Sequence, residues 1–333
     1  MASIPPRWRL AFALLAGSFF TACHDREDAP QRANGVPARE IVLADGRRVE
    51  VRSRAQHIFA SSSSVVDFLA ILAPAERVAA IPEQALDYAA LPADGAAWRK
   101  VPRFSAFIAE EVIARSPDLV LAEPWGDKDT VARLRGAGVE VVVLPEVRTW
   151  KDARATLLSL GELLQLEARA NELVRELDQR VAELEAHPGQ RRGLRALCYS
   201  NFGSGGMSAG VHTTIHEQIV LAGMTNALSE RGADGHVTIT FEDLIALDPD
   251  ILVVSAPLRG GEGTQGDRGG ASQRLLESEP SLRGLRAVKE QRIVALPPSL
   301  FACASPSIVR GAEVLAAAVD AVLARDPSAE KHE

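Results

Sequence analysis

The stretch AEEVIARSPDLVLA, residues 109–122, has a second version in FEDLIALDPDILVV, residues 241–254. In both, a helical pattern leads through Pro-Asp into a short apolar run, which predicts a helix followed by a buried strand. Five identical residues stand at equivalent positions: Glu110 and Glu242, Ile113 and Ile245, Ala114 and Ala246, Pro117 and Pro249, Asp118 and Asp250. The repetition predicts two equivalent lobes.

Residues 1–22 have the features of a secretory leader. Arg7 and Arg9 precede the apolar run LAFALLAGSFF, and small residues follow before Cys23. The run is shorter than the about 20 residues that a membrane-spanning helix needs. Small residues before Cys23 resemble the lipobox of bacterial lipoproteins, with Phe20 where Leu is usual; the alternative is a simple cleaved signal with an incidental cysteine. We therefore expect lipidation of Cys23.

The polar segment 23–39 has too few apolar residues to fold and is expected to be a flexible tether. The chain has 333 residues, 44 of them acidic and 37 basic, for a formal net charge of −7. An acidic exported chain is a poor candidate for nucleic-acid binding. Cys198 and Cys303 are the other thiols. Export permits a disulfide between them, but buried cysteines also pack as small hydrophobes, so the sequence leaves the bond open.

In the first half, short apolar strands alternate with helices. Asp-Gly between two alternating runs predicts a hairpin at 40–51. The strand 57–60 ends at four serines, one of which is expected to cap the following helix. Further helices and strands are expected at 77–81, 109–115, 118–122, 128–136 and 139–144. This alternation predicts a parallel sheet covered on both faces.

The second half has the same order. A strand at 194–200 precedes a glycine-rich loop at 203–210 and a helix opened by a capping box of Thr214 and Glu217. The remaining helices and strands are expected at 242–247, 250–254, 292–296 and 307–324.

Between the halves, apolar residues at steps of three and four predict a long helix over 166–187. Gly161 is expected to separate a shorter helix from it. The predicted fold is therefore α/β, with two doubly wound parallel-sheet lobes joined by a single long helix.

Two motifs offer competing chemistry. GMSAG, residues 206–210, matches the G-x-S-x-G elbow of α/β hydrolases, but the elbow needs a helix that starts at the serine, and here the helix starts only near residue 215. A hydrolase at Ser208 is thus the alternative from the enzyme class. His212 and His216 have a spacing that can hold zinc on a helix, although His212 precedes the helix. With His236, which is expected in a loop facing the cleft, they suggest a zinc or manganese carrier as a further alternative. For His236 itself, a solvated loop histidine is the favoured explanation.

Aromatic residues are concentrated after predicted strands. These are Tyr88, Trp98, Phe104, Phe107, Trp125, Phe202 and Phe301. Ligands of doubly wound sheets bind beyond the carboxyl ends of the strands, and aromatic walls suit large flat or apolar ligands. We expect part of this set to line a ligand cleft and the rest to pack the lobes.

Five stretches, taken in order, resemble the periplasmic binding proteins of ABC importers for iron siderophores, haem and vitamin B12. They are HIFASSSSVVDFLAILAPAERVAAI, SPDLVLA, TTIHEQIVLAGMTNAL, EDLIALDPDILVV and LRAVKEQRIVAL. The resemblance covers roughly residues 40 to 325. It completes the expected organisation: signal peptide 1–22, tether 23–39, first lobe 40–150, connecting helix 151–189, second lobe 190–327 and tail 328–333.

The resemblance also implies docking residues. Members of the family use one Glu on each lobe to contact arginines of the permease, which corresponds to Glu110 and Glu242. A Glu in a first helical turn also interacts favourably with the helix dipole. That explanation does not account for equivalent positions in both lobes.

The vitamin B12-binding member shows the closest resemblance. Its pocket aromatics correspond to Tyr88, Phe104, Trp125, Phe202 and Phe301, and we add Trp98 and His236 to the expected ligand-binding set. Phe104 stands where that member has a tryptophan, and no proline follows Tyr88. Haem coordinated by Tyr88 or His236, or an anionic ferric siderophore paired with Arg103, therefore stays open.

We expect a monomeric, lipid-anchored solute-binding protein in the periplasm or on the outer face of the cytoplasmic membrane. It would capture a metal chelate, with a corrinoid favoured over haem and ferric siderophore, and deliver it to an ABC permease dimer and its ATPase. Catalysis and a cofactor of its own are not expected, since cobalt or iron would arrive with the ligand. Modest closure about the helix 166–187 is expected, and the polar loop 259–272 would move over the cleft.

Overall fold

The structure, a computed structural model, describes residues 38–52, 55–92, 95–201, 206–258, 270–301 and 303–325. Cys23, Phe202 and most of the segment 259–272 lie outside these ranges. Within the described ranges, no helix has the length and apolar character needed to cross a bilayer.

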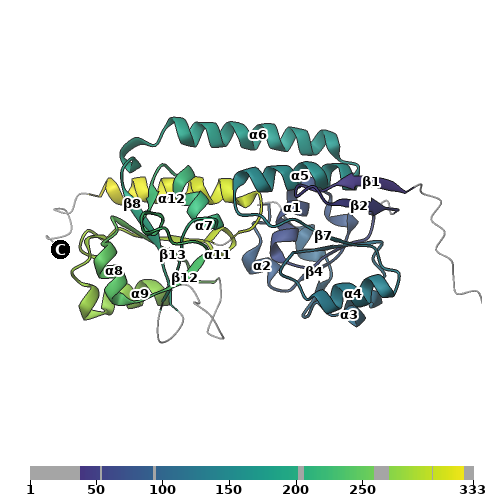
Figure 1. Ribbon diagram of the computed structural model, residues 1–333, viewed down its shortest axis with the longest axis horizontal. Helices are drawn as coiled ribbons and strands as arrows, with labels where there is room; N and C mark the ends of the chain where they lie inside the picture. The colour runs from purple at the N-terminus through teal and green to yellow at the C-terminus, as the bar shows by residue number, and fades with distance from the viewer. Residues whose placement is uncertain are drawn as a thin grey trace, which may run out of the picture. The chain divides into compact units, whose positions relative to one another are not determined.

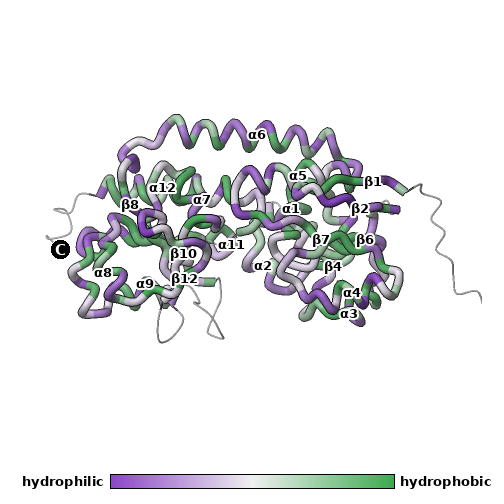
Figure 2. Tube along the Cα trace, in the orientation of Figure 1, coloured by the Kyte–Doolittle hydropathy of each residue, from purple (hydrophilic) through white to green (hydrophobic). Residues whose placement is uncertain are grey.

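The first sheet has five parallel strands in the order β5-β4-β3-β6-β7. They are β3 (Ile58–Ala60), β4 (Val78–Pro82), β5 (Arg103–Phe104), β6 (Leu119–Ala122) and β7 (Val141–Val143). The strands β3, β4 and β6 are buried along their whole length, which explains their continuous apolar sequences. Figure 2 shows the hydrophobic character of this sheet.

Helices cover both faces of the first sheet (Figure 1). On one face lie α3 (Ala109–Ala114) and α4 (Lys128–Gly136), and on the other α1 (Ser63–Leu72) and α5 (Trp150–Leu164). The short α2 (Ala85–Tyr88) follows β4. The expected serine cap is confirmed, because the Ser62 hydroxyl accepts a hydrogen bond from the Val65 N–H at 3.3 Å. The expected hairpin forms from β1 (Arg39–Val42) and β2 (Arg48–Val51).

The second sheet has four parallel strands in the order β11-β8-β13-β14. They are β8 (Arg195–Cys198), β11 (Thr225–Asn226), β13 (Ile251–Ser255) and β14 (Ile293–Leu296). One face packs against α7 (Thr214–Leu221) and α12 (Ser307–Leu323), the other against α8 (Phe241–Leu247), α9 (Ala271–Ser278) and α10 (Arg286–Lys289). The helix α11 (Pro298–Phe301) follows β14. The α/β fold with two parallel sheets is therefore confirmed.

A small antiparallel sheet in the second half differs from the sequence prediction. It consists of β9 (Ser200–Asn201), β10 (Gly206–Ala209) and β12 (His236–Ile239), in the order β12-β10-β9. Thus residues 206–209 and His236, predicted to lie in loops, belong to strands. Gly206 lets the Tyr199 ring pack directly on β10, because a Cβ there would lie 2.1 Å from the Tyr199 Cε2.

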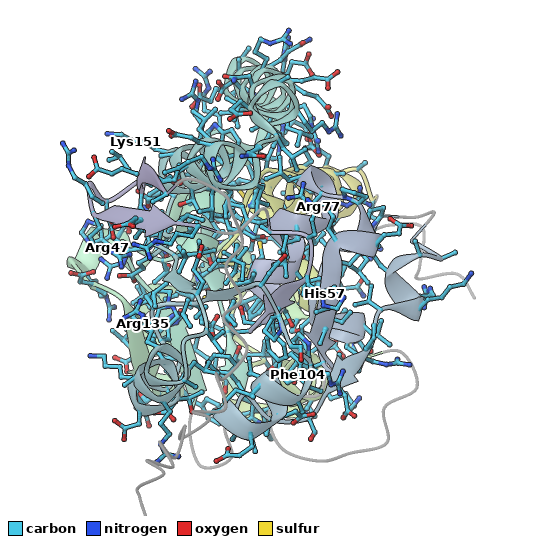
Figure 3. The ribbon with its side chains drawn as sticks, turned by 90° about the vertical axis from the view of Figure 1, so that its right-hand side faces the viewer. Arg47, His57, Arg77, Phe104, Arg135 and Lys151 are labelled. Atoms are coloured by element: carbon cyan, nitrogen blue, oxygen red, sulfur yellow. The ribbon has the colours of Figure 1, made fainter. Side chains whose placement is uncertain are left out.

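The helical connection breaks at Gln165, not at Gly161 as predicted. Gln165 has left-handed φ of 58°, and α6 (Glu167–Ala186) begins two residues later. Two arginines from distant segments cap the end of α5. Arg39 donates hydrogen bonds to the carbonyls of Glu162 and Leu163, and Arg77, labelled in Figure 3, donates one to the carbonyl of Leu164. Gly161 instead permits a close helix crossing, since its Cβ would lie 2.4 Å from the Ala170 Cβ.

The start of α7 also differs from the prediction by one residue. Thr213, not Thr214, is the N-cap, and its hydroxyl accepts a hydrogen bond from the His216 N–H. Glu217 does not close a capping box. Its Oε1 accepts a hydrogen bond at 3.0 Å from the N–H of Trp150, the first residue of α5. Glu217 therefore joins α7 of the second half to α5 of the first.

The repeated Pro-Asp has the same structural role in both sheets. Asp118 accepts hydrogen bonds from the N–H groups of Gln56 and His57, just before β3. Asp250 accepts one from the Arg195 N–H at the start of β8. Each aspartate thus fixes the strand that follows it beside the first strand of its own sheet.

The C-terminal helix α12 takes part in both hydrophobic cores. Its Ile308, Val309 and Ala312 pack in the core that contains α1, α5 and α6, while Leu315 and Val319 pack in that of the second sheet. Two side-chain interactions add to this linkage. Arg180 of α6 forms a bidentate ion pair with Glu313 of α12, and Ser305 donates a 2.7 Å hydrogen bond to Asp67 of α1.

Candidate functional site

The strand order predicts a ligand crevice at the carboxyl ends of β3 and β6. From β3 the chain proceeds to β4 and β5 on one side and returns to β6 and β7 on the other. In sheets of this kind, ligands bind where the order reverses. The residues that follow β3 and β6 are Ser61–Ser64 and Glu123–Trp125. They are held together because the Glu123 N–H donates to the Ser61 hydroxyl at 3.3 Å and the Ser61 N–H donates to the Leu121 carbonyl.

The structure has a hollow at this crevice. The space between its walls is about 300 Å³ when open solvent is counted, and about 20 Å³ is available to the centre of a water molecule. Ser64, Val65 and Phe68 of α1 form one wall, Glu123, Pro124 and Trp125 a second, and the segment after β7 a third. Ala304, from the connection between α11 and α12, completes the lining. The hollow therefore combines the switch point of the first sheet with a residue from the C-terminal part of the chain.

The predicted ligand aromatics fall into two groups. Trp125 is 64% exposed and lines the hollow, and Tyr88 is 44% exposed at the end of α2. Phe301, partly buried, ends α11, which contacts α2. In contrast, Trp98 and Phe104 are 5% and 3% exposed and pack in the core of the first half.

Phe104 is held in that core by neighbouring rings. Its centroid lies 4.5 Å from that of Phe59, which also contacts Phe107 at 6.1 Å. Figure 3 shows Phe104 among other side chains. The position after a strand predicted the correct edge of the sheet for Phe104, but its ring points into the packing between the sheet and α3. Phe202 lies outside the described residues.

Ser208 lacks the surroundings of a nucleophile. It lies within β10, is 2% exposed, and donates a 2.6 Å hydrogen bond to the Cys198 carbonyl. A nucleophilic serine needs an accessible hydroxyl and a base within hydrogen-bonding reach. The structure gives this serine a structural role in joining β10 to β8.

The three histidines of the suggested metal site do not share a common set of contacts. His212 Nδ1 lies 2.9 Å from Asp234 Oδ1, whereas His216 contacts Asn226. Burial lowers the pKa of His216. His236 is exposed in β12. Within the described part of the chain, no group of three His, Cys, Asp or Glu residues could hold a metal ion.

Cys198 and Cys303 are free, buried thiols. Burial raises the pKa of Cys198 to about 11 and that of Cys303 still further. Both therefore stay protonated at neutral pH and act as small apolar side chains.

Glu110 and Glu242 lie at the same place on equivalent helices. Each is the second residue of its helix, α3 or α8, and each is exposed. The neighbouring acids are engaged within the fold: Glu111 pairs with Arg115, and Asp243 caps α8 together with Thr240. Neither Glu110 nor Glu242 forms an ion pair with another residue in the described ranges.

Sequence reasoning missed two acidic residues, one in the lining of the hollow and one buried within α1. Glu123 directly follows β6 and lines the hollow; its position after a predicted strand was the available signal. Asp67 is buried in α1, where it accepts hydrogen bonds from the Ala90 N–H at 2.6 Å and from Ser305. An acid inside the apolar pattern VVDFLAIL was the signal for Asp67. Burial raises the pKa of Asp67 to about 7.

The family model for periplasmic binding proteins matches residues 58–300. The chain belongs to the periplasmic binding protein family. The match spans both parallel sheets and the helices that connect them, so the expected family membership is confirmed.

Individual relatives of this periplasmic binding protein are distant. An uncharacterized ABC transporter substrate-binding lipoprotein, YvrC of Bacillus subtilis (strain 168), is 21% identical over 63% of this chain and 64% of its own. A cobalamin-binding protein of Halobacterium salinarum is 27% identical over 60% of this chain and 52% of its own. The chain thus spans less than two thirds of the length of these curated relatives.

Among solved structures, the periplasmic heme-binding protein RhuT from Roseiflexus sp. RS-1 in its apo form superposes with a TM-score of 0.68. It is 20% identical, and the superposition covers 80% of this chain and 99% of RhuT. At this identity the similarity supports the two-lobed α/β fold.

Proposed function

We propose that this periplasmic binding protein is the solute-binding component of an ABC importer and that it captures a metal chelate, a corrinoid before haem or a ferric siderophore. The observation that carries the proposal is the hollow at the β3/β6 switch point with the exposed Trp125 on its wall. An exposed tryptophan beside apolar residues offers a flat surface to a large ring system. The cobalamin-binding relative supports the corrinoid.

The ligand would lie against the carboxyl edge of the first sheet. Tyr88 and Phe301 supply further aromatic surface, since α2 and α11 are in contact. Haem and ferric siderophores remain the competing ligands, the former through Tyr88 or His236 and the latter through Arg103. Residues of the chain would hold the chelate without covalent chemistry, so we propose no catalytic step.

Calorimetric titration of the protein from residue 38 onward tests the ligand directly. Cyanocobalamin, haemin and a ferric trihydroxamate are titrated separately. Saturable one-to-one binding is expected, tightest for cyanocobalamin. Absence of binding by all three would refute the proposed function.

Glu110 and Glu242 are proposed to dock the loaded protein onto cationic groups of a two-fold permease. Their exposure and their lack of ion-pair partners among the described residues support this role. We predict that Glu110→Ala combined with Glu242→Ala abolishes uptake into cells while ligand affinity stays unchanged, because neither glutamate lines the hollow. Glu172→Ala, which removes an exposed acid from α6, is the control. Reduced affinity in the double variant would contradict this assignment.

A lipid on Cys23 is proposed to anchor the monomeric protein in the periplasm or at the outer face of the cytoplasmic membrane. The similarity to a substrate-binding lipoprotein supports this arrangement. Palmitate labelling should be lost in Cys23→Ala. Labelling that persists in this variant would refute the anchor.

A further inference from the structure

The wall of the hollow carries a carboxylate that pairs with no cation among the described residues. Among the described residues that line the hollow, Glu123 alone has a charged side chain. Its backbone is fixed, because its N–H donates to Ser61 and its carbonyl accepts from the Gly126 N–H at 3.2 Å. Its carboxylate forms no ion pair with another residue of the described ranges. The fold therefore fixes the backbone of Glu123 and leaves its carboxylate available to a ligand.

In the described lining of the hollow, no basic side chain balances Glu123. Arg148, which follows the lining residue Val147, is held in a bidentate ion pair with Glu146. Arg103 lies on β5, separated from β6 by β4 and β3. At about 4.8 Å per strand, this separation is on the order of 14 Å. Glu123 is thus the charged side chain that a ligand meets in the described lining of the hollow.

The apolar residues around Glu123 make its carboxylate sensitive to the polar groups that a ligand presents. Val65, Phe68 and Trp125 share the lining with Glu123, and an apolar wall strengthens electrostatic interactions relative to bulk water. A ligand that covers Glu123 must supply hydrogen-bond donors or leave the carboxylate desolvated and unpaired, which is unfavourable. A ligand carboxylate at the same place adds like-charge repulsion.

We infer that Glu123 determines ligand specificity: it selects chelates that present amide N–H or cationic donors to the wall of the hollow and discriminates against chelates that present carboxylates. This inference rests on the proposed function and narrows it. The amide-rich periphery of a corrinoid fits the selected class. Haem, with two propionates, belongs to the disfavoured class.

The test compares cyanocobalamin with its monocarboxylic derivatives, in which one peripheral amide is replaced by a carboxylate. One of these derivatives places its new carboxylate against Glu123. For the wild-type protein, its dissociation constant should be at least about tenfold higher than that of cyanocobalamin, which is the loss expected for one charge-assisted hydrogen bond. Glu123→Gln should bring the ratio of the two dissociation constants to within about threefold, because the amide side chain can donate to a carboxylate. Glu123→Asp keeps the charge and should retain the preference.

Glu172→Gln is the matched control, since it removes the same charge from an exposed position on α6. Equal affinity of the wild type for cyanocobalamin and all its acid derivatives, or an unchanged ratio in Glu123→Gln, would overturn the inference. So would tighter binding of haemin than of cyanocobalamin, which would leave the capture of a metal chelate intact but not the preference for a corrinoid. Failure of cyanocobalamin, haemin and a ferric trihydroxamate to bind would instead remove the proposed function itself.

Discussion

Asp67 should make the stability of this protein fall as pH rises from about 4 to about 7. Its carboxyl group is buried in α1 and accepts hydrogen bonds from the Ala90 N–H and the Ser305 hydroxyl. Burial disfavours the charged form and raises the pKa from 3.8 to about 7, and the two hydrogen bonds compensate only in part. The folded state therefore holds a proton on Asp67 over a pH range in which the unfolded chain has released it.

The sign and size of the effect follow from this difference. Between pH 4 and pH 7 the folded state binds more protons than the unfolded state, so the free energy of unfolding decreases with pH and levels off above 7. Each pKa unit corresponds to about 1.4 kcal/mol, which gives a total of about 4 kcal/mol. Asp67→Asn imitates the protonated carboxyl group. Its stability should match that of the wild type near pH 4 and exceed it by up to about 4 kcal/mol at pH 8.

Urea denaturation followed by tryptophan fluorescence, from pH 4 to pH 8, measures this effect. Other groups also titrate in this range: burial lowers the pKa of His216 and raises that of Glu217. Because both are present in each protein, the difference between wild type and Asp67→Asn isolates Asp67. Glu172→Gln should follow the wild-type curve. A difference that does not change with pH would refute the reasoning.

Three further substitutions test the packing and the site. Gly161→Ala should lower the free energy of unfolding by about 1–3 kcal/mol, because the new Cβ would overlap Ala170; Gly136→Ala, with open space around it, should change stability little in the same thermal unfolding assay. Trp125→Ala should weaken chelate binding in calorimetry at least about tenfold without lowering stability, since the ring is mostly exposed. Ser208→Ala should lower the free energy of unfolding by about 1 kcal/mol, because the hydrogen bond to the Cys198 carbonyl is lost, and should leave chelate affinity unchanged. Reduced chelate affinity would instead indicate that Ser208 takes part in ligand binding.

Periodicity and turn chemistry predicted the fold because they act locally. The buried strands β3, β4 and β6 are continuous apolar runs, and the serine turn caps α1 as expected. The break at Gln165 was not predictable in this way. It depends on Arg39 and Arg77, which satisfy the last carbonyls of α5 from 124 and 87 residues away in the chain.

The candidate site was harder to predict from the sequence, because it depends on side-chain directions and on contacts between residues far apart in the chain. Following a strand identifies the edge of the sheet but not the direction of a side chain. Phe104 and Trp125 both follow or end strands, yet Phe104 packs on Phe59 and Trp125 remains exposed. The link between Asp67 and Ser305 joins residues 238 positions apart, and the short strands β9 and β10 show no alternating pattern.

The stretch 109–122 and its second version, 241–254, share residues of two kinds. Some of the shared residues are needed for folding, and the others are not explained by it. Asp118 and Asp250 are both engaged within the chain, since each ties its strand to the first strand of its sheet. Ile113 and Ile245 are 43% and 47% exposed, and Glu110 and Glu242, three residues earlier on the same helix faces, have no ion-pair partner in the described ranges. An internal packing requirement would have drawn the isoleucines into the core and the glutamates into ion pairs. The equivalence of these four exposed positions therefore supports the proposed docking onto a partner with two similar surfaces, each of which would receive one carboxylate and one apolar side chain.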